Sequence, residues 1–472
     1  MSRARFVSTS VTAIVQRATH DRLLVVLLFS TIALAGALSP MQNDTWWHMR
    51  AGADMWASRH VLLTDIYSHT AHGAFWPNHE WLSDLIFYGL YRVGGLPLVS
   101  MCAAAIIMAA WTMTWRLTAG SSMRRFLMIA PVLLPASLHW EPRPHVFSLL
   151  FLLTVVTLAL QGRYLWLPLV FWVWANCHGG VLLGFVVIIA AAAAEVFEDP
   201  RRWWRVALVI AACALAATAT PLGTSFWIEI PKSMARIRQY PINEWQRPEL
   251  TDKTLLPFWA VAVVFVAALV RQWRELVTHG NRRMRMLCLC ALALLPLALS
   301  AVRNVGPFVM LAIPALSVLV PLDFARDPAR RRQRPLLNAA IMSVASLAVV
   351  ITIAYAYRFQ IDHLRWTPLP QASLQALQRC PDNLYNRYDE GGFLIWFARD
   401  RLVFLDGRQD PYPPSLIHEH MRTETSGDYA STFARYNIHC AYLPVSSPVA
   451  ARLSAVGWTA LYRDPKWVVL TE

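Results

Sequence analysis

The sequence predicts a mainly α-helical bundle that spans a membrane many times, followed by a small α/β domain, and three observations point to this fold class. Hydrophobic residues make up 56% of the 472 residues and charged residues only 15%, against about 25% charged in ordinary globular proteins. Apolar runs such as 23–38, 181–194 and 336–354 approach the ~20 residues that a helix needs to cross a bilayer. Arginines cluster in the short links between such runs. A soluble cytosolic protein, a disordered chain and a disulfide-dense secreted mini-protein are therefore excluded.

Eleven membrane spans are predicted, and the first lies at 22–38. Arg3, Arg5 and Arg17 precede this run, but the run is long and 39–41 is a poor cleavage site, so we predict an uncleaved span rather than a signal peptide. Two of the other spans are short and contain proline, which membrane helices tolerate where neighbours satisfy the backbone. The ten further spans are predicted at about 96–115, 126–138, 145–160, 164–176, 181–197, 206–221, 257–270, 286–302, 305–321 and 336–357.

The arginine clusters predict the orientation of the chain in the membrane. The basic links 116–125, 161–163, 198–205, 271–285 and 324–335 all fall on one side when the N-terminus is cytoplasmic, as the positive-inside rule requires. An odd number of spans then exports the C-terminus. The expected location is a membrane, with the N-terminus on its cytoplasmic side and the C-terminal domain on its exported side. Nucleic-acid binding is not expected, because the net charge of +14 is scattered along the chain without a reader motif.

Two domains are predicted, a membrane domain at 1–357 and an exported α/β domain at 358–472. Strand-like runs at 383–387, 402–405, 440–444 and 467–470 interleave with helix-like stretches, which is typical of a small α/β domain. Only two of the seven cysteines, Cys380 and Cys440, fall in this domain. We predict that they form a disulfide, because an oxidising compartment permits the pairing.

The first exported loop, 41–95, carries three acidic clusters beside aromatic residues. Asp44, Asp65 and Glu80 mark these clusters. Tryptophan is common at membrane interfaces, but carboxylates there are less common. A carboxylate at the end of a span can act as a general base or hold a cation.

These motifs resemble a bacterial family of multispanning proteins with the GT-C glycosyltransferase architecture. The resemblance begins with Asp44 and the Trp-Trp-His that follows it, continues through 64–68, and includes the His-Glu-Trp-Leu at 79–82. Similar motifs follow in order at 143–144, 174–180, 243–245, 303–304, 385–392 and 403–408.

The resemblance implies both a fold and an activity. It implies a GT-C-type bundle that transfers a glycosyl group from a polyprenyl-phosphate-linked sugar to a lipid, glycan or protein acceptor on the exported side, among membrane lipids. GT-C enzymes carry an acidic residue in the first exported loop, often in an Asp-x-Asp pair. Asp44 matches that position, but no second Asp follows at 46. Dependence on a divalent cation, Mg²⁺ or Mn²⁺, is therefore left open.

Asp44 and Glu80 are the candidate catalytic residues. A carboxylate near the acceptor hydroxyl supplies the base that transfer needs, whereas the structural alternative for Asp44 is a helix N-cap. Glu80 and Asp65 could orient a hydroxyl or hold a cation, or could form salt bridges within a folded loop. His48 and His79, from the same loop, are candidate substrate-binding residues.

The remaining candidates lie on later segments that reach the same side of the membrane. His178, in a glycine-flanked turn, could contact a phosphate or sugar or make a structural hydrogen bond. Arg303 and Arg143 could hold a lipid phosphate through paired hydrogen bonds, or could extend to the interface as long cationic side chains do. Glu244 is a further acidic candidate. The Asp-Gly-Arg at 406–408 is predicted to be a turn.

Two functions remain open on these residues. One is glycosyl transfer; the other is a non-catalytic lipid-glycan flippase or assembly partner with the same architecture. An enzyme requires the base and a phosphate-binding cation to act at one anomeric centre. The sequence therefore predicts that Asp44, Glu80, His178 and Arg303 line one cavity that is open to lipid.

Overall fold

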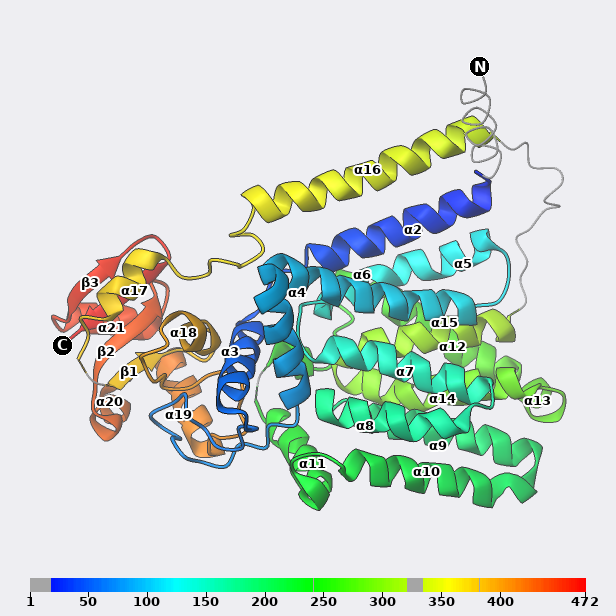
Figure 1. Ribbon diagram of the computed structural model, residues 1–472, viewed down its shortest axis with the longest axis horizontal. Helices are drawn as coiled ribbons and strands as arrows, with labels where there is room; N and C mark the ends of the chain where they lie inside the picture. Colours follow the sequence, from blue (N-terminus) through cyan, green and yellow to red (C-terminus); the bar gives the residue numbers. More distant parts are fainter. Residues whose placement is uncertain (1–17, 241, 321–333, 382) are drawn as a thin grey trace.

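The computed structural model describes residues 18–240, 242–320, 334–381 and 383–472. A bundle of roughly aligned helices forms the larger part, and the C-terminal domain packs at one end of it (Figure 1). The bundle contains α2 (His20–Ala37), α3 (Asn43–Ser58), α4 (Trp81–Leu117), α5 (Ser122–Ile129), α6 (Leu133–Ala136), α7 (His145–Leu160), α8 (Leu167–Cys177), α9 (Val181–Glu198), α10 (Trp203–Thr218), α11 (Phe226–Ile237), α12 (Leu256–Arg271), α13 (Trp273–Thr278), α14 (Arg282–Ser300), α15 (Val305–Leu319) and α16 (Pro335–Phe359).

The predicted membrane spans correspond to helical segments of the bundle. Within the described residues, seven helices are long and apolar enough to cross a membrane, and the bent pair Pro200–Thr218 and Gly223–Ile237 could add an eighth. Two further apolar helices, His145–Leu160 and Tyr164–Cys177, are shorter. The segment predicted at 126–138 is divided among α5, a 3₁₀ turn and α6. An integral membrane protein follows from these helices, while the count of eleven spans stays a prediction.

The first loop is more helical than the sequence predicted. It contains α3 and the first part of α4, which begins at Trp81. The backbone leaves helical geometry at Gly94 and Gly95, where Gly95 has a φ of 64°, a conformation that glycine adopts without the penalty of a Cβ. A short, partly polar helix therefore precedes this kink, and the helix that follows it begins where the span was predicted, near residue 96.

The C-terminal domain is built on one four-stranded sheet. Its strand order is β1-β2-β4-β3, with β1 parallel to β2 and the other two pairs antiparallel. The elements are α17 (Gln371–Leu377), β1 (Asn383–Asn386), α18 (Gly391–Phe397), α19 (Pro414–Ser426), α20 (Ala430–Tyr436), β2 (Ile438–Pro444), α21 (Pro448–Ala455), β3 (Thr459–Arg463) and β4 (Trp467–Thr471). This arrangement confirms the small α/β domain.

Two details of this domain test the sequence predictions. The disulfide between Cys380 and Cys440 is confirmed, with the two Cα atoms 5.6 Å apart. The strand predicted at 402–405 is wrong, because Val403 forms only an isolated bridge with Ser68 of the first loop. The buried run there is apolar because it packs between the domain and the loop, not because it joins the sheet.

The domain is fixed to the bundle through α3 and the first loop. The amide of Gly392, in α18, donates a hydrogen bond of 2.5 Å to Asn43 Oδ1. A Cβ at residue 392 would lie 2.4 Å from that oxygen, so only glycine permits this approach. The rings of Trp46 and Phe397 pack with centroids 4.7 Å apart. These contacts place the domain directly over the end of the bundle.

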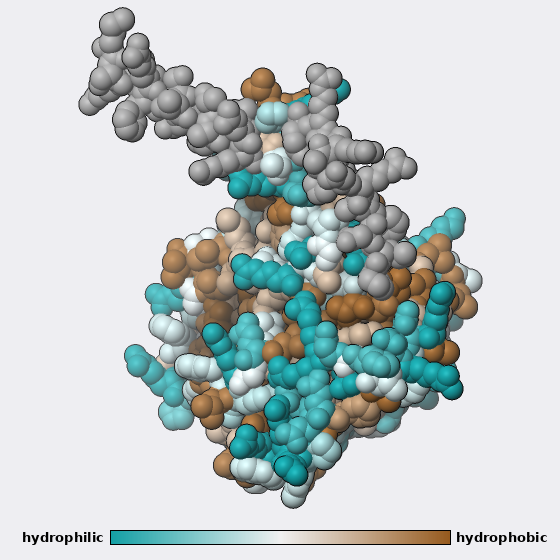
Figure 2. Space-filling model, turned by 90° about the vertical axis from the view of Figure 1, so that its right-hand side faces the viewer, coloured by the Kyte–Doolittle hydropathy of each residue, from teal (hydrophilic) through white to brown (hydrophobic). Residues whose placement is uncertain are grey.

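The arginine clusters of the described residues lie at the opposite end of the bundle, whereas most of the basic link predicted at 324–335 lies outside the described residues. The starts of α5, α10 and α14, which carry these clusters, all lie at the end away from the C-terminal domain (Figure 1). Figure 2 views this end and shows hydrophilic residues gathered across it among hydrophobic ones. Arg282 there donates to the carbonyl oxygens of Ala159 and Leu160 at the end of α7.

This one-sided distribution yields a prediction about topology. Because basic loops stay cytoplasmic, we expect a reporter fused after Arg334 to lie in the cytoplasm and one fused after Glu472 to lie on the exported side. Compartment-specific reporter activity measures both positions. The same compartment for both fusions would contradict the assignment of α16 as a span and the export of the domain.

Candidate active site

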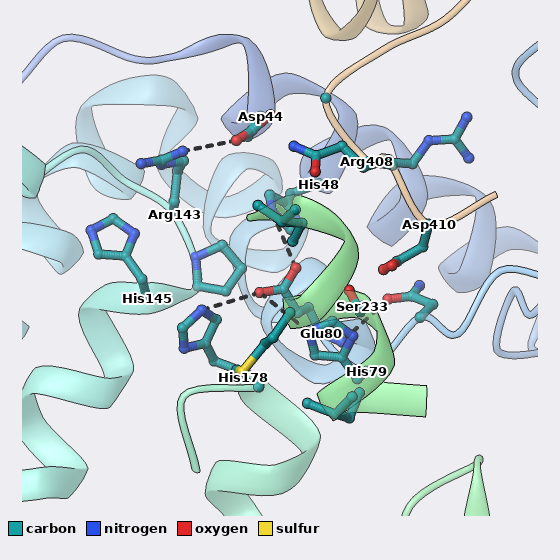
Figure 3. Close-up of a pocket in the computed structure, with 18 of the residues that line it drawn as sticks. Asp44, His48, His79, Glu80, Arg143, His145, His178, Ser233, Arg408 and Asp410 are labelled. Carbon is teal, nitrogen blue, oxygen red and sulfur yellow. Dashed lines mark hydrogen bonds and ion pairs between the residues drawn. The ribbon is translucent and has the colours of Figure 1, made fainter. Parts of the chain in front are cut away.

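A polar cavity lies where the bundle meets the C-terminal domain (Figure 3). We call it the central cavity, and its volume is about 120 Å³. Side chains from eight parts of the chain line it. They include Asp44, Trp47 and His48 of α3, Asn78, His79 and Glu80 before α4, Arg143 and His145, His178, Ser233 of α11, Glu244, Trp245 and Arg303, and residues 407–410.

A row of alternating charges forms one wall of the central cavity. Arg143 donates hydrogen bonds of 2.8 Å to both Asp44 and Glu244, and Arg303 approaches Glu244 at 3.3 Å. Trp245 supports the guanidinium of Arg303, which lies 4.2 Å from its ring centroid. Burial alone would raise the pKa of Glu244, but the charges of Arg143 and Arg303 outweigh it and hold that pKa below its ordinary value. Glu244 is therefore ionised and keeps both arginines in place.

Glu80 faces three imidazole rings across the floor of the cavity (Figure 3). Its carboxylate oxygens lie 3.5 Å from His178 Nε2, 3.8 Å from His48 Nε2 and 4.0 Å from His79 Nε2. Asp84 fixes the ring of His48, since His48 Nδ1 lies 2.6 Å from its carboxylate. The three imidazole rings are therefore directed toward the Glu80 carboxylate.

Burial sets the charge of this cluster. It lowers the pKa of His48 to about 4 and the pKa of His178 well below its usual value, where the charge of Arg303 adds to the effect. Burial also raises the pKa of Glu80. The two rings are therefore neutral at pH 7 and offer both donors and acceptors.

An apolar groove opens from the central cavity between the membrane helices. It has a volume of about 250 Å³ and shares Arg143, His178 and Arg303 with the central cavity. Its walls come mainly from α7, α9, α11, α14 and α15, and the apolar side chains are Leu149, Leu182, Leu183, Val186, Met234, Trp245, Leu297 and Pro307. Two guanidinium groups thus stand where the polar cavity meets the apolar groove.

The structure brings together eight of the nine residues predicted as catalytic or substrate-binding. The residues that line the central cavity are Asp44, His48, His79, Glu80, Arg143, His178, Glu244 and Arg303. The predicted convergence of Asp44, Glu80, His178 and Arg303 on one cavity is therefore observed. Their roles remain proposals.

Asp65 is the exception. Its carboxylate is fully buried, lies 2.6 Å from Arg408 Nη2, and accepts a hydrogen bond of 2.5 Å from Ser68 Oγ. It does not line the central cavity. The salt-bridge alternative fits Asp65, because its charge is already matched, and we assign it no contact with substrate.

The sequence missed the contribution of the C-terminal domain to the site. Gly407, Arg408, Gln409 and Asp410 line the central cavity, although the motif at 406–408 was predicted only as a turn. A Cβ at residue 407 would lie 2.2 Å from Asp44 Oδ1, so glycine lets the domain backbone close over this carboxylate. An Asp-Gly pair predicts a turn but not what the turn touches.

The donor set does not match a Mg²⁺ or Mn²⁺ site. Within the described part of the chain, no group of three His, Cys, Asp or Glu side chains is arranged to hold a metal ion. Asp44 and Glu244 already form ion pairs with arginines, and imidazole rings surround Glu80. Mg²⁺ and Mn²⁺ are hard cations that favour oxygen ligands instead. No step described below uses a metal.

Comparison with solved structures reveals two proteins of the same architecture. The apo oligosaccharyltransferase of Archaeoglobus fulgidus superposes with a TM-score of 0.54 at 11% identity, over 90% of this chain and 69% of that one. ArnT from Cupriavidus metallidurans bound to undecaprenyl phosphate superposes with a TM-score of 0.50 at 13% identity, over 94% of this chain and 97% of that one. The chain has a GT-C-type fold. This confirms the predicted fold class.

Sequence comparison adds no closer relative to this GT-C-type chain. No protein-family model and no curated protein sequence matches it. At 11–13% identity, likeness to the two structures shows the fold alone.

Proposed function

We propose that this GT-C-type protein is a membrane glycosyltransferase that moves a glycosyl group from a polyprenyl-phosphate-linked donor to an acceptor. One observation carries the proposal. Arg143 and Arg303 stand at the junction between an apolar groove among membrane helices and a polar cavity that contains Asp44 and Glu80. A polyprenyl-phosphate-linked sugar matches these three surfaces in order: the isoprenoid chain fits the apolar groove, the phosphate fits the two arginines, and the sugar fits the polar cavity.

Each part of the donor has a matching surface. The guanidinium groups suit the phosphate, because arginine binds its oxygens in pairs. The groove walls formed by α9 and α14 suit the isoprenoid chain, whose burial is favourable by about 25 cal/mol per Å². The sugar would then lie beside Glu80, His48 and His178. The similar ArnT structure contains undecaprenyl phosphate, which supports a lipid of this class.

The proposed reaction uses Asp44 as the base. The acceptor oxygen forms a bond to the anomeric carbon while the bond from that carbon to the phosphate oxygen breaks. The electron pair of the broken bond stays on the phosphate, where Arg303 and Arg143 stabilise the charge. The acceptor proton passes to the Asp44 carboxylate. The products are the glycosylated acceptor and free polyprenyl phosphate.

The proposal places this reaction on the exported face of a bacterial inner membrane. Helix α3, which contributes Asp44 and His48 to the central cavity, lies at the end of the bundle next to the C-terminal domain, away from the starts of α5, α10 and α14 (Figure 1). A lipid-linked donor suits that face, because nucleotide sugars are cytosolic. The acceptor is a lipid, glycan or protein on the same side.

The role of Arg303 in lipid binding can be tested directly. We expect Arg303→Gln to weaken binding of undecaprenyl phosphate by about 10- to 100-fold, the scale of a lost charge-assisted hydrogen-bonded pair. Glu244 keeps its bond to Arg143 in this variant, so the fold should persist. Native mass spectrometry or calorimetry of the purified protein in detergent measures the affinity.

Arg399→Gln is the matched control, because Arg399 also stacks on a tryptophan, with its guanidinium 4.6 Å from the centroid of Trp396. Arg399 lies outside the central cavity and the groove, so its replacement should leave the affinity unchanged. Equal affinity of the Arg303→Gln variant and the wild type would show that the phosphate binds elsewhere.

A further inference from the structure

A second cavity approaches Asp44 from the side of the C-terminal domain. We call it the interdomain cavity; its volume is about 550 Å³, within the usual range of about 300–1,000 Å³ for small-molecule sites. Its bundle wall includes Asn43, His139 and Glu141, and its domain wall includes Tyr388 and Glu424. No part of the donor proposed above occupies it.

The interdomain cavity and the central cavity meet at four shared residues. Asp44, Arg143, Glu244 and Gln409 line both cavities. Glu80 and His178 line the central cavity and not the interdomain one. The ion-paired row therefore lies between the two spaces. A molecule in the interdomain cavity would present its reactive group to Asp44 from the side away from Glu80.

The lining of the interdomain cavity is acidic. Five carboxylates line it against two guanidinium groups, those of Arg143 and Arg387. The two imidazoles add no positive charge at neutral pH, because burial lowers the pKa of His139 to about 4 and the pKa of His420 to about 3. A negative lining favours cationic or neutral ligands and disfavours anionic ones.

Four buried side-chain atoms of its lining residues lack a hydrogen-bond partner; two are His139 Nε2 and Arg143 Nε, and the other two belong to Glu141 and Gln409. Glu141 is only 5% exposed, and its Oε2 accepts no hydrogen bond; the nearest cation, Arg143, is 3.8 Å away. Its other oxygen accepts from Gln42 at 2.5 Å. Gln409, 8% exposed, leaves its Oε1 without a donor. These two oxygens are acceptors, and a buried acceptor without a donor costs about 1–3 kcal/mol, so each calls for a donor from a ligand.

We propose that the interdomain cavity is the acceptor site, and that it selects a polyhydroxylated acceptor bearing an ammonium group, of the amino-sugar class, with Glu141 as the anchor of that group. This rests on the proposed function, which supplies the reaction at Asp44. The acceptor hydroxyl gives its proton to Asp44 and its oxygen bonds to the anomeric carbon in the central cavity. The ammonium is bound and does not react.

The test compares three small probes that share one ring: glucosamine, glucose and glucose 6-phosphate. Their dissociation constants are measured by calorimetry or ligand-observed NMR with the full chain in detergent, loaded with undecaprenyl phosphate. We expect glucosamine to bind about tenfold more tightly than glucose, the scale of one charge-assisted hydrogen bond. Glucose 6-phosphate should bind more weakly than glucose.

The Glu141→Gln variant localises the effect. It should remove the advantage of glucosamine and leave the affinity for glucose unchanged, because glutamine keeps the oxygen but not the charge. Glu275→Gln is the matched control, since Glu275 is exposed on α13 at the far end of the bundle, and it should keep the tenfold preference.

Several outcomes would overturn the proposal. They are an equal affinity for glucosamine and glucose, a preference for glucose 6-phosphate, or a glucosamine preference that persists in Glu141→Gln. Should that variant not fold, the wild-type comparison of the three probes still decides the charge preference. Binding of undecaprenyl phosphate is measured on the same samples, so a failure of the acceptor proposal is distinguished from a failure of the donor assignment.

Discussion

Replacing Asp44 with asparagine is expected to lower the kcat of glycosyl transfer by about 10² to 10⁴-fold, the usual contribution of a general base. Asparagine has nearly the same shape, so the hydrogen bond from Trp47 Nε1, 3.1 Å long, can persist. Arg143 keeps its bond to Glu244. The variant therefore loses the proton acceptor and keeps the cavity. Release of free polyprenyl phosphate in a single-turnover assay measures the change.

A binding measurement with undecaprenyl phosphate distinguishes this loss of kcat from misfolding of the variant. The Asp44→Asn variant should bind undecaprenyl phosphate as tightly as the wild type, because Arg303 and the apolar groove are unchanged. Asp428→Asn, an exposed change in the C-terminal domain, is the matched control and should leave kcat unaltered. A kcat for Asp44→Asn within about threefold of the wild type would rule out Asp44 as the base.

The Arg408→Met variant is expected to cost about 3–5 kcal/mol of folding free energy, because it leaves two buried carboxylates without their cation. Arg408 has no exposed side-chain surface and lies 2.6 Å from Asp65 and 2.7 Å from Asp406. Burial would lower the pKa of Arg408, but the charges of Asp406 and Asp65 outweigh it and raise that pKa. The loss should appear as easier unfolding in pulse proteolysis of the detergent-solubilised protein.

An exposed ion pair provides the comparison for this stability effect. Lys232 lies 3.3 Å from Glu229, and the two side chains are 49% and 20% exposed. Such pairs contribute about 0–1 kcal/mol, so Lys232→Met should change the unfolding free energy by no more than about 1 kcal/mol. Similar losses for the two variants would contradict the structural role given to the buried pairs of Arg408.

The sequence could predict the parts of the fold that depend on local pattern. Long apolar runs locate helices such as α9 and α16, because the length of an apolar run sets the span. The pairing of Cys380 with Cys440 followed from their shared compartment. The strand at 402–405 failed because an apolar run is equally consistent with burial between two units. β3 was missed because its residues are largely exposed and lack a strong pattern.

Some residues of the candidate site could be predicted from the sequence, and others could not. Asp44, Glu80, His178 and Arg303 could be selected because charged or titratable residues at span ends are unusual. The contribution of residues 407–410 could not, since it depends on how the domain docks against α3. The pairing of Asp65 with Arg408 joins residues more than 340 positions apart, and no local pattern predicts such a contact. The sequence therefore predicts most residues of the site, but not the way in which the C-terminal domain covers it.

The most direct test follows a labelled sugar from lipid to acceptor. The purified protein is reconstituted in vesicles with undecaprenyl phosphates that carry radiolabelled sugars, and a delipidated fraction of envelope glycans serves as acceptor. We expect label to leave the lipid and appear covalently on the acceptor, with release of undecaprenyl phosphate. We expect Asp44→Asn to slow this transfer by about 10²- to 10⁴-fold. Label that crosses the bilayer while it stays attached to the lipid would contradict glycosyl transfer and identify a flippase.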